Sequence, residues 1–396
     1  MTTKRLPYVH LDLLGLRTGA FILCLALLAL ALGRTASAQQ PRVIAFDAPG
    51  ATATVPDGLT LTGTIVGYYL DENFVAHGFL RTPDGHFTSF DAPGAGTTPD
   101  NSNGTFPLGV NQLGTVVGYY EDDNSVSHCF IRTADGKITT FDAPGADVSP
   151  AAQAGSQLTG ISPTGLTVGL YTGSNLVTHG FLRSPGGQFT SFDASPNSVS
   201  TFPNGPVNLE GALVGFYADT APRFHAFVRD PRGTISVLTF PDSCDGTIPE
   251  GCVGFGDLNI NLFGWSVGTF QDANLVHHGF LRSPDGEITA FDAPGAGNVG
   301  PYQGTIFSYN FTPDGNEVAG LNDLGAVAAT YLDADYVYHG FLRTPDGKFT
   351  SFDAPGADLT PGALNGTFPF AINDLGVVIG IYTDANYLPH GFIREP

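Results

Sequence analysis

The amino-acid sequence predicts an all-β protein, on three observations of composition. Glycine and proline are abundant (52 and 29 of 396 residues), whereas lysine and methionine are scarce, so the residues that favour helices are largely missing. Phenylalanine (30) and tyrosine (14), which suit pleated strands, are plentiful. A hydrophobic content of 42% is too high for a disordered chain. Long helices and coiled coils are therefore excluded.

The first 38 residues have the pattern of an export signal. Basic residues precede an uncharged apolar run over residues 20–32, and Ala36-Ser37-Ala38 supplies the small residues that a signal peptidase requires. The run is shorter than the roughly 20 residues that span a bilayer. We predict a signal peptide over residues 1–38, cleavage after Ala38, and a secreted, periplasmic or extracellular protein with no membrane span after cleavage.

The net charge of the chain limits the classes of molecule that it can bind. The net charge is −21, and it becomes −24 once the leader takes away four cations and one anion. Such a surface repels phosphate backbones and anionic lipids, so nucleic acid is excluded as a partner. Cys244 and Cys252 lie close together in the sequence, and an exported protein can oxidise them. We predict a disulfide between them, with two unpaired thiols as the alternative.

Two short segments recur through residues 39–396, the first of them at intervals of 46 to 61 residues. The first resembles His-Gly-Phe-Leu-Arg and begins at His77, His128, His179, His225, His278, His339 and His390. The second resembles Phe-Asp-Ala-Pro-Gly and begins at Phe46, Phe90, Phe141, Phe192, Phe240, Phe291 and Phe352. Each segment therefore has seven copies in one predicted domain, residues 39–396.

Each repeat contains four extended stretches separated by turn residues. In the second copy we predict strands over residues 106–110, 115–120, 126–132 and 137–141, with Asx-rich and Asp-Gly turns between them. Four antiparallel strands in about 50 residues are typical of one β-propeller blade. Neighbouring apolar residues point to opposite faces of these strands, which favours blades stacked on blades. A glycine recurs in the second strand, which indicates close backbone approach there.

The ends of the repeat region predict a closed ring. The region begins with a lone fourth strand, residues 43–47, and finishes with a lone third strand, residues 390–394, so the two complete one blade. Closure of this kind removes exposed sheet edges. The sequence therefore predicts a seven-bladed β-propeller with four antiparallel strands per blade, closed by the N-terminal strand; six or eight blades would require a miscounted repeat.

The repeat resembles the bacterial extracellular repeat family named for its His-Ala-Phe signature, which occurs literally at His225-Ala226-Phe227. The segment Ala371–Val378 also matches that family's Gly-Ile-Asn turn followed by Val-Val-Gly. The chain departs from the family in carrying Gly for Ala in most copies and in its Phe-Asp-Ala-Pro-Gly segment. The resemblance spans residues 43–394 and implies an exported repeat protein, with no catalytic residues to carry over.

The recurrent histidine is predicted to face an aspartate across the hairpin of the third and fourth strands. The pairs are His77 with Asp91, His128 with Asp142, His179 with Asp193, His278 with Asp292, and His339 with Asp353. A catalytic dyad is one interpretation, but a group that recurs in every blade is better read as a structural tether. The recurrent arginines are expected to pair with carboxylates.

Paired oxygen ligands also recur, in the turn between the second and third strands. They are Asp71 and Asn73, Asp122 and Asn124, Asp272 and Asn274, Asp333 and Asp335, and Asp384 and Asn386. Two oxygens per turn are too few for Ca²⁺, which takes six to eight, unless adjacent turns share an ion. Side chain to backbone bonds within the turn are the better reading. No metal or other cofactor is predicted, and calcium stays an alternative.

Function in propellers concentrates where the repeat is broken. The irregular segment 297–317 carries four aromatic residues that could stack on sugar rings: Tyr302, Phe307, Tyr309 and Phe311. The alternative is that this insertion packs against its own blade. Trp265 is predicted to lie in a strand and in the core.

Three functions remain open from the sequence. The first is an exported, non-catalytic, monomeric scaffold that binds a protein, glycan or cell-wall component through its acidic loops. The second is a propeller lyase or hydrolase acting on an extracellular polysaccharide or peptide, which would need converging titratable groups outside the repeat. The third is a purely structural surface protein. The sequence shows no such catalytic set, so binding is favoured.

Overall fold

The structure is a computed structural model that describes residues 41–99, 103–150, 154–220, 223–240, 255–307 and 320–396. Residues Arg42–Pro396 form one compact unit. Its described residues form strands, turns and loops without a helix, which confirms the all-β prediction. Across these ranges, therefore, no helix is long and apolar enough to cross a membrane.

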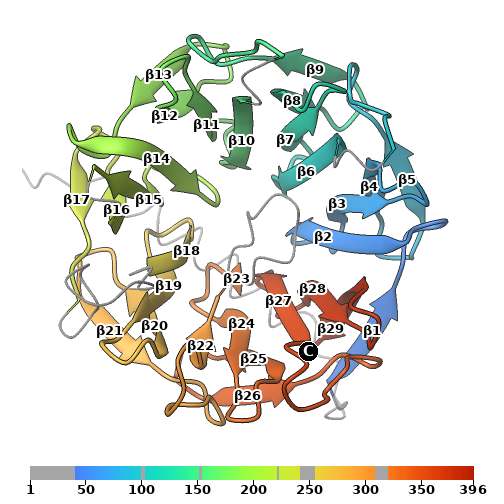
Figure 1. Ribbon diagram of the computed structural model, residues 1–396, viewed down its shortest axis with the longest axis vertical. Helices are drawn as coiled ribbons and strands as arrows, with labels where there is room; N and C mark the ends of the chain where they lie inside the picture. Colours follow the sequence, from blue (N-terminus) through green and yellow to red (C-terminus); the bar gives the residue numbers. More distant parts are fainter. Residues whose placement is uncertain (1–40, 100–102, 151–153, 221–222, 241–254, 308–319) are drawn as a thin grey trace, which may run out of the picture. The chain divides into compact units, whose positions relative to one another are not determined.

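The strands pair antiparallel in consecutive sets that are arranged around a common centre, from an inner first strand to an outer fourth strand (Figure 1). The first three sets are β2 (Ala53–Leu59), β3 (Ile65–Leu70), β4 (Ala76–Arg81) and β5 (Phe87–Phe90); β6 (Gly104–Val110), β7 (Val116–Glu121), β8 (Ser127–Arg132) and β9 (Ile138–Phe141); and β10 (Gly155–Ile161), β11 (Thr167–Thr172), β12 (Thr178–Arg183) and β13 (Phe189–Phe192). The next two are β14 (Ser198–Asn204), β15 (Leu213–Asp219), β16 (Phe224–Arg229) and β17 (Ile235–Val237); and β18 (Phe255–Ile260), β19 (Ser266–Gln271), β20 (His277–Arg282) and β21 (Ile288–Phe291). The last two are β22 (Gly304–Ile306) with β23 (Gly320–Leu321), β24 (Val327–Leu332), β25 (Tyr338–Arg343) and β26 (Phe349–Phe352); and β27 (Thr367–Ile372), β28 (Val378–Thr383), β29 (Pro389–Glu395) and β1 (Arg42–Phe46).

This radial arrangement of four-stranded sheets is a β-propeller, as the repeat predicts. The predicted strands of the second copy match β6 to β9 to within two residues at each end. The exception to regular sets is the sixth, whose inner strand is divided into β22 and β23. Turn and strand chemistry repeated at a fixed period was therefore sufficient to place the elements.

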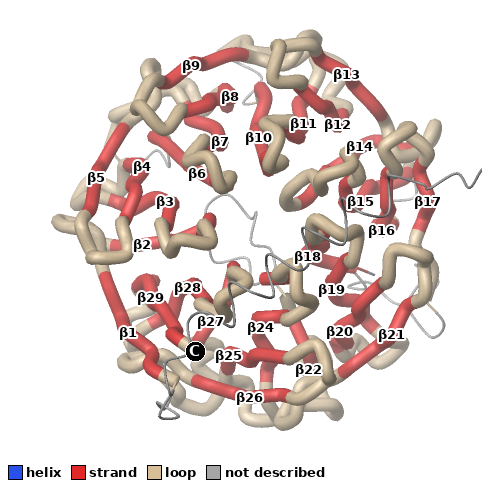
Figure 2. Tube along the Cα trace, turned by 180° about the vertical axis from the view of Figure 1, so that it is seen from behind, coloured by secondary structure: helices blue, strands red, loops and turns tan. Residues whose placement is uncertain are grey.

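The two ends of the unit meet in one sheet. β1 pairs antiparallel with β29 over five residue pairs, from Arg42 opposite Glu395 to Phe46 opposite Gly391. Figure 2, from the opposite side, shows β1 at the rim beside β29. The last set also packs against the first, because Ile379 shares a buried cluster with Phe79.

The recurrent glycine of the second strand stands where the sheet leaves no room for a side chain. A Cβ atom at Gly118 would lie 2.1 Å from the carbonyl oxygen of Phe106 on the paired inner strand. The sixth set carries Ala329 at this position, because Ala329 lies opposite Phe341 as Gly118 lies opposite Phe130. Gly320 of the same set lies opposite Ala328, as Gly109 lies opposite Val117 in the second set, so the glycine of the inner strand is retained.

Between described residues, no salt bridge joins a recurrent arginine to a carboxylate, although Asp84 lies near enough to Arg81 to favour its charged form. Arg81 instead places its guanidinium carbon 5.0 Å from the ring centre of Phe46 and 5.8 Å from that of Phe87. Arg183 stacks on Phe141 of the preceding set at 4.4 Å. The fourth strand of one set ends beside the third strand of the next, so an aromatic ring reaches the arginine before any carboxylate does. These contacts join neighbouring sets by cation–π attraction.

Candidate functional site

Antiparallel pairing gives the propeller two faces of different composition. The loop face carries the turns between second and third strands and the connections that leave each fourth strand. The turn face carries the turns between first and second strands and those between third and fourth strands. The inner strands surround a common centre (Figure 1), and residues of several of these strands line a pocket there, which we call the channel. Every candidate residue of the sequence analysis within the described ranges lies on the loop face or in the strands beneath it.

Each Asx turn of the loop face is held by its aspartate. Asp71 Oδ1 accepts the N–H groups of Asn73 (2.8 Å) and Val75 (2.9 Å). This capping lets Phe74 adopt a left-handed backbone conformation (φ 60°) that non-glycine residues rarely take. Burial opposes ionisation, but these hydrogen bonds and the nearby His77 leave the pKa of Asp71 below its ordinary value.

In five of the third strands the histidine lies between two carboxylates. His77 Nδ1 is 2.9 Å from Asp91 Oδ1, and its Nε2 is 3.7 Å from Asp71 Oδ2. The ring of Tyr69 lies against the imidazole, with 5.2 Å between ring centres. One imidazole therefore ties the second-to-third turn to the end of the fourth strand.

All five predicted histidine–aspartate pairs are brought together by the structure. The Nδ1–Oδ1 distances are 2.9 Å for His77 and Asp91, 2.9 Å for His128 and Asp142, 2.6 Å for His179 and Asp193, 2.9 Å for His278 and Asp292, and 2.9 Å for His339 and Asp353. A sixth pair, His390 with Asp47 (3.0 Å), was not predicted and joins the two ends of the unit. The sequence signal for it is the first Phe-Asp-Ala-Pro-Gly copy, which begins at Phe46. The fourth set places His225 beside Asp219 at 3.2 Å.

Protonation should strengthen these networks. The hydrogen bond to Asp353 raises the pKa of His339 above its ordinary value of 6.5, although burial opposes the shift. A pKa raised by folding stabilises the protein below pH 6.5, and that contribution disappears as the pH rises through the folded-state value.

We therefore expect His339→Gln to lower the free energy of unfolding more at pH 6 than at pH 8. Urea denaturation at both pH values measures the difference. The control is His86→Gln, because His86 is an exposed turn residue on the other face. An equal loss at both pH values would show that the imidazole contributes only packing.

The candidate calcium residues hold their own turns together. Each aspartate of these turns accepts backbone N–H groups through Oδ1, and in four of the five the asparagine amide also contacts Oδ2: Asp71 with Asn73, Asp122 with Asn124, Asp272 with Asn274, and Asp384 with Asn386, while Asp333 accepts from the N–H of Asp335. Across the described ranges, no three His, Cys, Asp or Glu side chains are grouped to hold a metal ion.

The irregular segments give a mixed result. Tyr302 is 47% exposed, whereas Phe307 is 2% exposed and packs with Phe291 and Phe341 in the core. The prediction of Phe307 as an exposed stacking residue was therefore wrong, because the inner strand continues through β22 and buries the residue that follows it. Tyr309 and Phe311 lie outside the described residues. Cys244 and Cys252 do so as well.

The prediction for Trp265 was also wrong. It lies before β19 in a turn of the turn face and is 36% exposed, next to Phe263, which is 65% exposed. The turn residue Asn261 accepts the N–H of Trp265. Trp265 was assigned to a strand, but it belongs to the turn that precedes β19.

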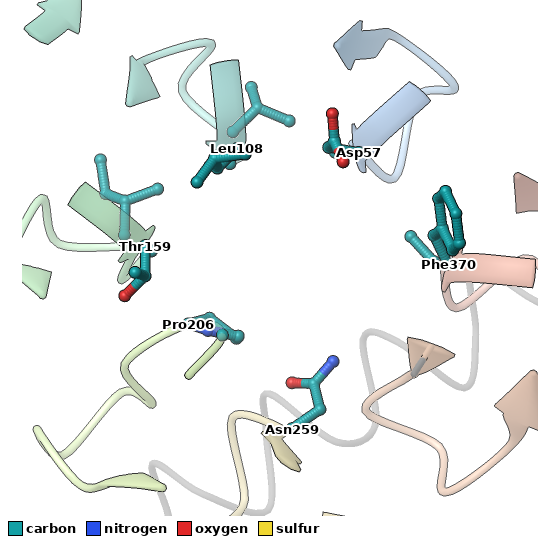
Figure 3. A pocket seen from close by; sticks show the side chains of 13 residues that line it. Asp57, Leu108, Thr159, Pro206, Asn259 and Phe370 are labelled. Carbon is teal, nitrogen blue, oxygen red and sulfur yellow. The ribbon is translucent and has the colours of Figure 1, made fainter. Parts of the chain in front are cut away.

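The channel is a pocket of about 150 Å³ where the repeat is broken (Figure 3). Asp57, Leu108, Thr159 and Phe370 stand at the same position in four inner strands, three residues before the turn, yet all four differ. The remaining labelled side chains, Pro206 and Asn259, come from the fourth and fifth sets. The lining thus combines an apolar part with a carboxylate, a hydroxyl and an amide. No repeat-based reasoning could have found this set, because its members share no motif.

Charge divides unequally between the two faces. The described charged residues of the loop face are Asp47, Asp71, Glu72, Asp91, Glu121, Asp122, Asp123, Asp142, Asp147, Asp193, Asp219, Arg223, Asp272, Asp292, Asp333, Asp335, Asp353, Asp358 and Asp384. Those of the turn face are Arg42, Arg81, Asp84, Arg132, Asp135, Lys137, Arg183, Glu210, Arg229, Asp230, Arg232, Arg282, Asp285, Glu287, Asp323, Arg343, Asp346, Lys348, Asp374, Arg394 and Glu395. The turn face is close to neutral, so the described excess of negative charge lies on the loop face.

Comparison with known proteins shows similarity at the level of the fold. A prolyl endopeptidase structure matches with a TM-score of 0.51 and 11% identity, covering 87% of this chain and 50% of that one. The lectin BP39L from Burkholderia pseudomallei matches with a TM-score of 0.47 and 10% identity, covering 87% of this chain and 95% of that one. The lectin of the fungus Aleuria aurantia, described as a six-bladed β-propeller, matches with a TM-score of 0.43 and 14% identity. The match covers 82% of this chain and 97% of that one. No protein-family model and no curated protein sequence matches.

Proposed function

We propose that this chain is an exported, non-catalytic seven-bladed β-propeller that binds a protein, glycan or cell-wall component through its acidic loop face. The strand sets support the blade count, since each has its own inner and outer strands. The sheet that joins β1 to β29 supports closure by the N-terminal strand. Residues 1–38 lie outside the described residues, but their sequence has the pattern of an export signal. This pattern supports secretion with removal of the leader.

The observation that carries the binding proposal is the unequal charge of the two faces. On the loop face of the described residues, Arg223 is the single arginine or lysine among the carboxylates. Glu72 and Asp335 are exposed there, in the turns between the second and third strands of the first and sixth sets. A field of one sign steers partners of the opposite sign and weakens with salt. The loop face is therefore suited to cationic groups on a protein or on a charged wall polymer.

Binding is tested with the secreted protein on a glycan array and on isolated cell walls. We expect retention that falls at least about tenfold when salt rises from ~50 to ~500 mM, because the attraction is screened. The variant Glu72→Lys/Asp335→Lys should reduce retention similarly. The matched control, Glu210→Lys/Glu287→Lys, makes the same charge change on the turn face and should bind as the parent protein does.

Three outcomes would contradict this proposal. Equal loss in both double variants would show an effect of net charge rather than of one face. Release of cleaved or unsaturated sugar or peptide products in the same incubation would favour the lyase or hydrolase alternative. Absence of retention on every wall fraction and glycan would favour a purely structural surface protein. Membership of the His-Ala-Phe repeat family stays a prediction beside this proposal, and calcium binding stays an alternative.

A further inference from the structure

The turn face presents large apolar side chains to solvent at the mouth of the channel. They lie in the turns that join first and second strands, and we call them the turn tips: Leu61 (40% exposed), Leu113 (72%), Leu209 (55%), Phe263 (65%), Trp265 (36%), Leu324 (64%) and Leu375 (63%). Every such turn contributes except that of the third set, where Pro163 is half-buried. Single exposed leucines are ordinary, but a repeated ring of them is not.

The turns that carry these tips are in contact, so the tips belong to one surface. Asn373 Nδ2 donates to the carbonyl of Thr60 (3.1 Å), and Asn322 Nδ2 donates to that of Asn373 (3.0 Å). Asn261 Nδ2 continues the series to Asn322 (3.0 Å). The N–H of Leu61 reaches Gln112 Oε1 at 2.8 Å. The turns of the fifth, sixth, seventh, first and second sets are thus joined in series, and their tips are held in place before any partner arrives.

Polar groups of these turns are directed between the turns rather than outward. Asp323 Oδ1 accepts the N–H of Leu262, and Asp374 Oδ1 accepts the N–H of Asp323, both at 2.9 Å. Burial, together with the nearby Asp374, raises the pKa of Asp323, although the Leu262 bond opposes this. Asp323 and Asp374 are therefore engaged within the ring, and the apolar tips are exposed.

We propose that the turn face is the interface of a dimer with a second copy of this chain, with the two loop faces directed outward. Two copies of an acidic chain repel each other, and the near-neutral turn face is where they approach at the least electrostatic cost. The tips expose on the order of 800 Å², taking roughly 200 Å² for a large side chain, which is about one partner's share of a standard interface. This inference is independent of the proposed function and replaces the predicted monomer.

Sedimentation equilibrium of the secreted protein over a concentration series tests the proposal. We expect the mass to double as the concentration rises through the micromolar range. Raising salt from ~50 to ~500 mM should increase the dimer fraction, because screening weakens the repulsion between like net charges. A monomer at every concentration and salt level would overturn the proposal, and so would a dimer that dissociates in salt.

The decisive variant is Leu113→Asp/Leu324→Asp/Leu375→Asp. These side chains are exposed, so we expect an unchanged melting temperature and at least a tenfold weaker dimer. A dimer that is unaffected by these changes would place the interface elsewhere and overturn the proposal.

The matched control adds the same three charges to the loop face. Phe74→Asp/Leu176→Asp/Tyr387→Asp changes residues that are 51%, 74% and 55% exposed, at positions with positive φ that aspartate tolerates. This control should remain dimeric. If it dissociates as the first variant does, the cause is net charge and the proposed interface is wrong. Flotation of a monomer with phosphatidylcholine vesicles, lost in the first variant, would assign the tips to a lipid surface and equally overturn the dimer.

Discussion

Gly118→Ala should lower the free energy of unfolding by about 3 kcal/mol, as overpacking of a fixed backbone does. The added Cβ would lie 2.1 Å from the Phe106 carbonyl oxygen and 2.8 Å from Pro107 Cα. Neither atom belongs to a flexible side chain, so β6 and β7 must separate. Denaturation in guanidinium, followed by tryptophan and tyrosine fluorescence, measures the loss. Because β6 also lines the channel, the pocket should widen or collapse with it.

The same blade contains a matched control. Gly109 lies in β6 opposite Val117, one pair away from Gly118 and Pro107. A Cβ there would meet Val117 Cγ2 at 3.5 Å and Gly160 Cα at 3.8 Å, which is ordinary contact. Gly109→Ala should change stability by less than about 1 kcal/mol, with a stabilising contribution from the restricted unfolded chain. Similar losses in both variants would mean that glycine is needed for backbone flexibility, and the steric account would be wrong.

The sequence predicted the propeller because the same turn and strand chemistry occurs in every repeat. Asp71 and His77, for example, stand at fixed positions relative to the strands, so their neighbourhood follows from register alone. The contact of Arg81 with Phe46 could not be predicted in this way. Phe46 lies in β1, which belongs to the last set, and the angle between neighbouring sets does not follow from strand register.

The candidate site was predicted least where residues do not repeat. Asp57, Thr159 and Phe370 meet in the channel because their inner strands surround one centre, although the strands are distant in sequence. Trp265 shows a different error. It was assigned to a strand and to the core, whereas it lies in a turn that leaves it exposed to solvent. Burial depends on which neighbour covers a position, and a single repeat does not contain that neighbour.

Removal of β1 should cost about 5 kcal/mol or more, or prevent folding. A protein that begins at Ala48 loses the five residue pairs with β29 and the ring of Phe46, whose loss alone corresponds to about 3 kcal/mol. It also loses the bond between His390 and Asp47 and leaves β29 as an open edge. Thermal melting and light scattering of the purified chain measure the outcome. We expect a lower melting temperature and association through the exposed strand.

Moving β1 to the C-terminal end of the chain distinguishes two explanations of the lower stability. One is the loss of ring closure, and the other is the loss of the β1 residues themselves. Glu395-Pro396 can be continued with Asp-Gly, as at Pro83, and then with Arg42–Asp47, so that β1 follows β29 as β5 follows β4. If β1 acts by completing the last sheet, this permuted chain should recover the stability of the parent to within about 1 kcal/mol, because the native pairs reform and only the loop changes. A permuted chain as unstable as the truncated one would show that β1 must enter from the N-terminal side. The proposed closure, in which one sheet is shared by two chain ends, would then be wrong.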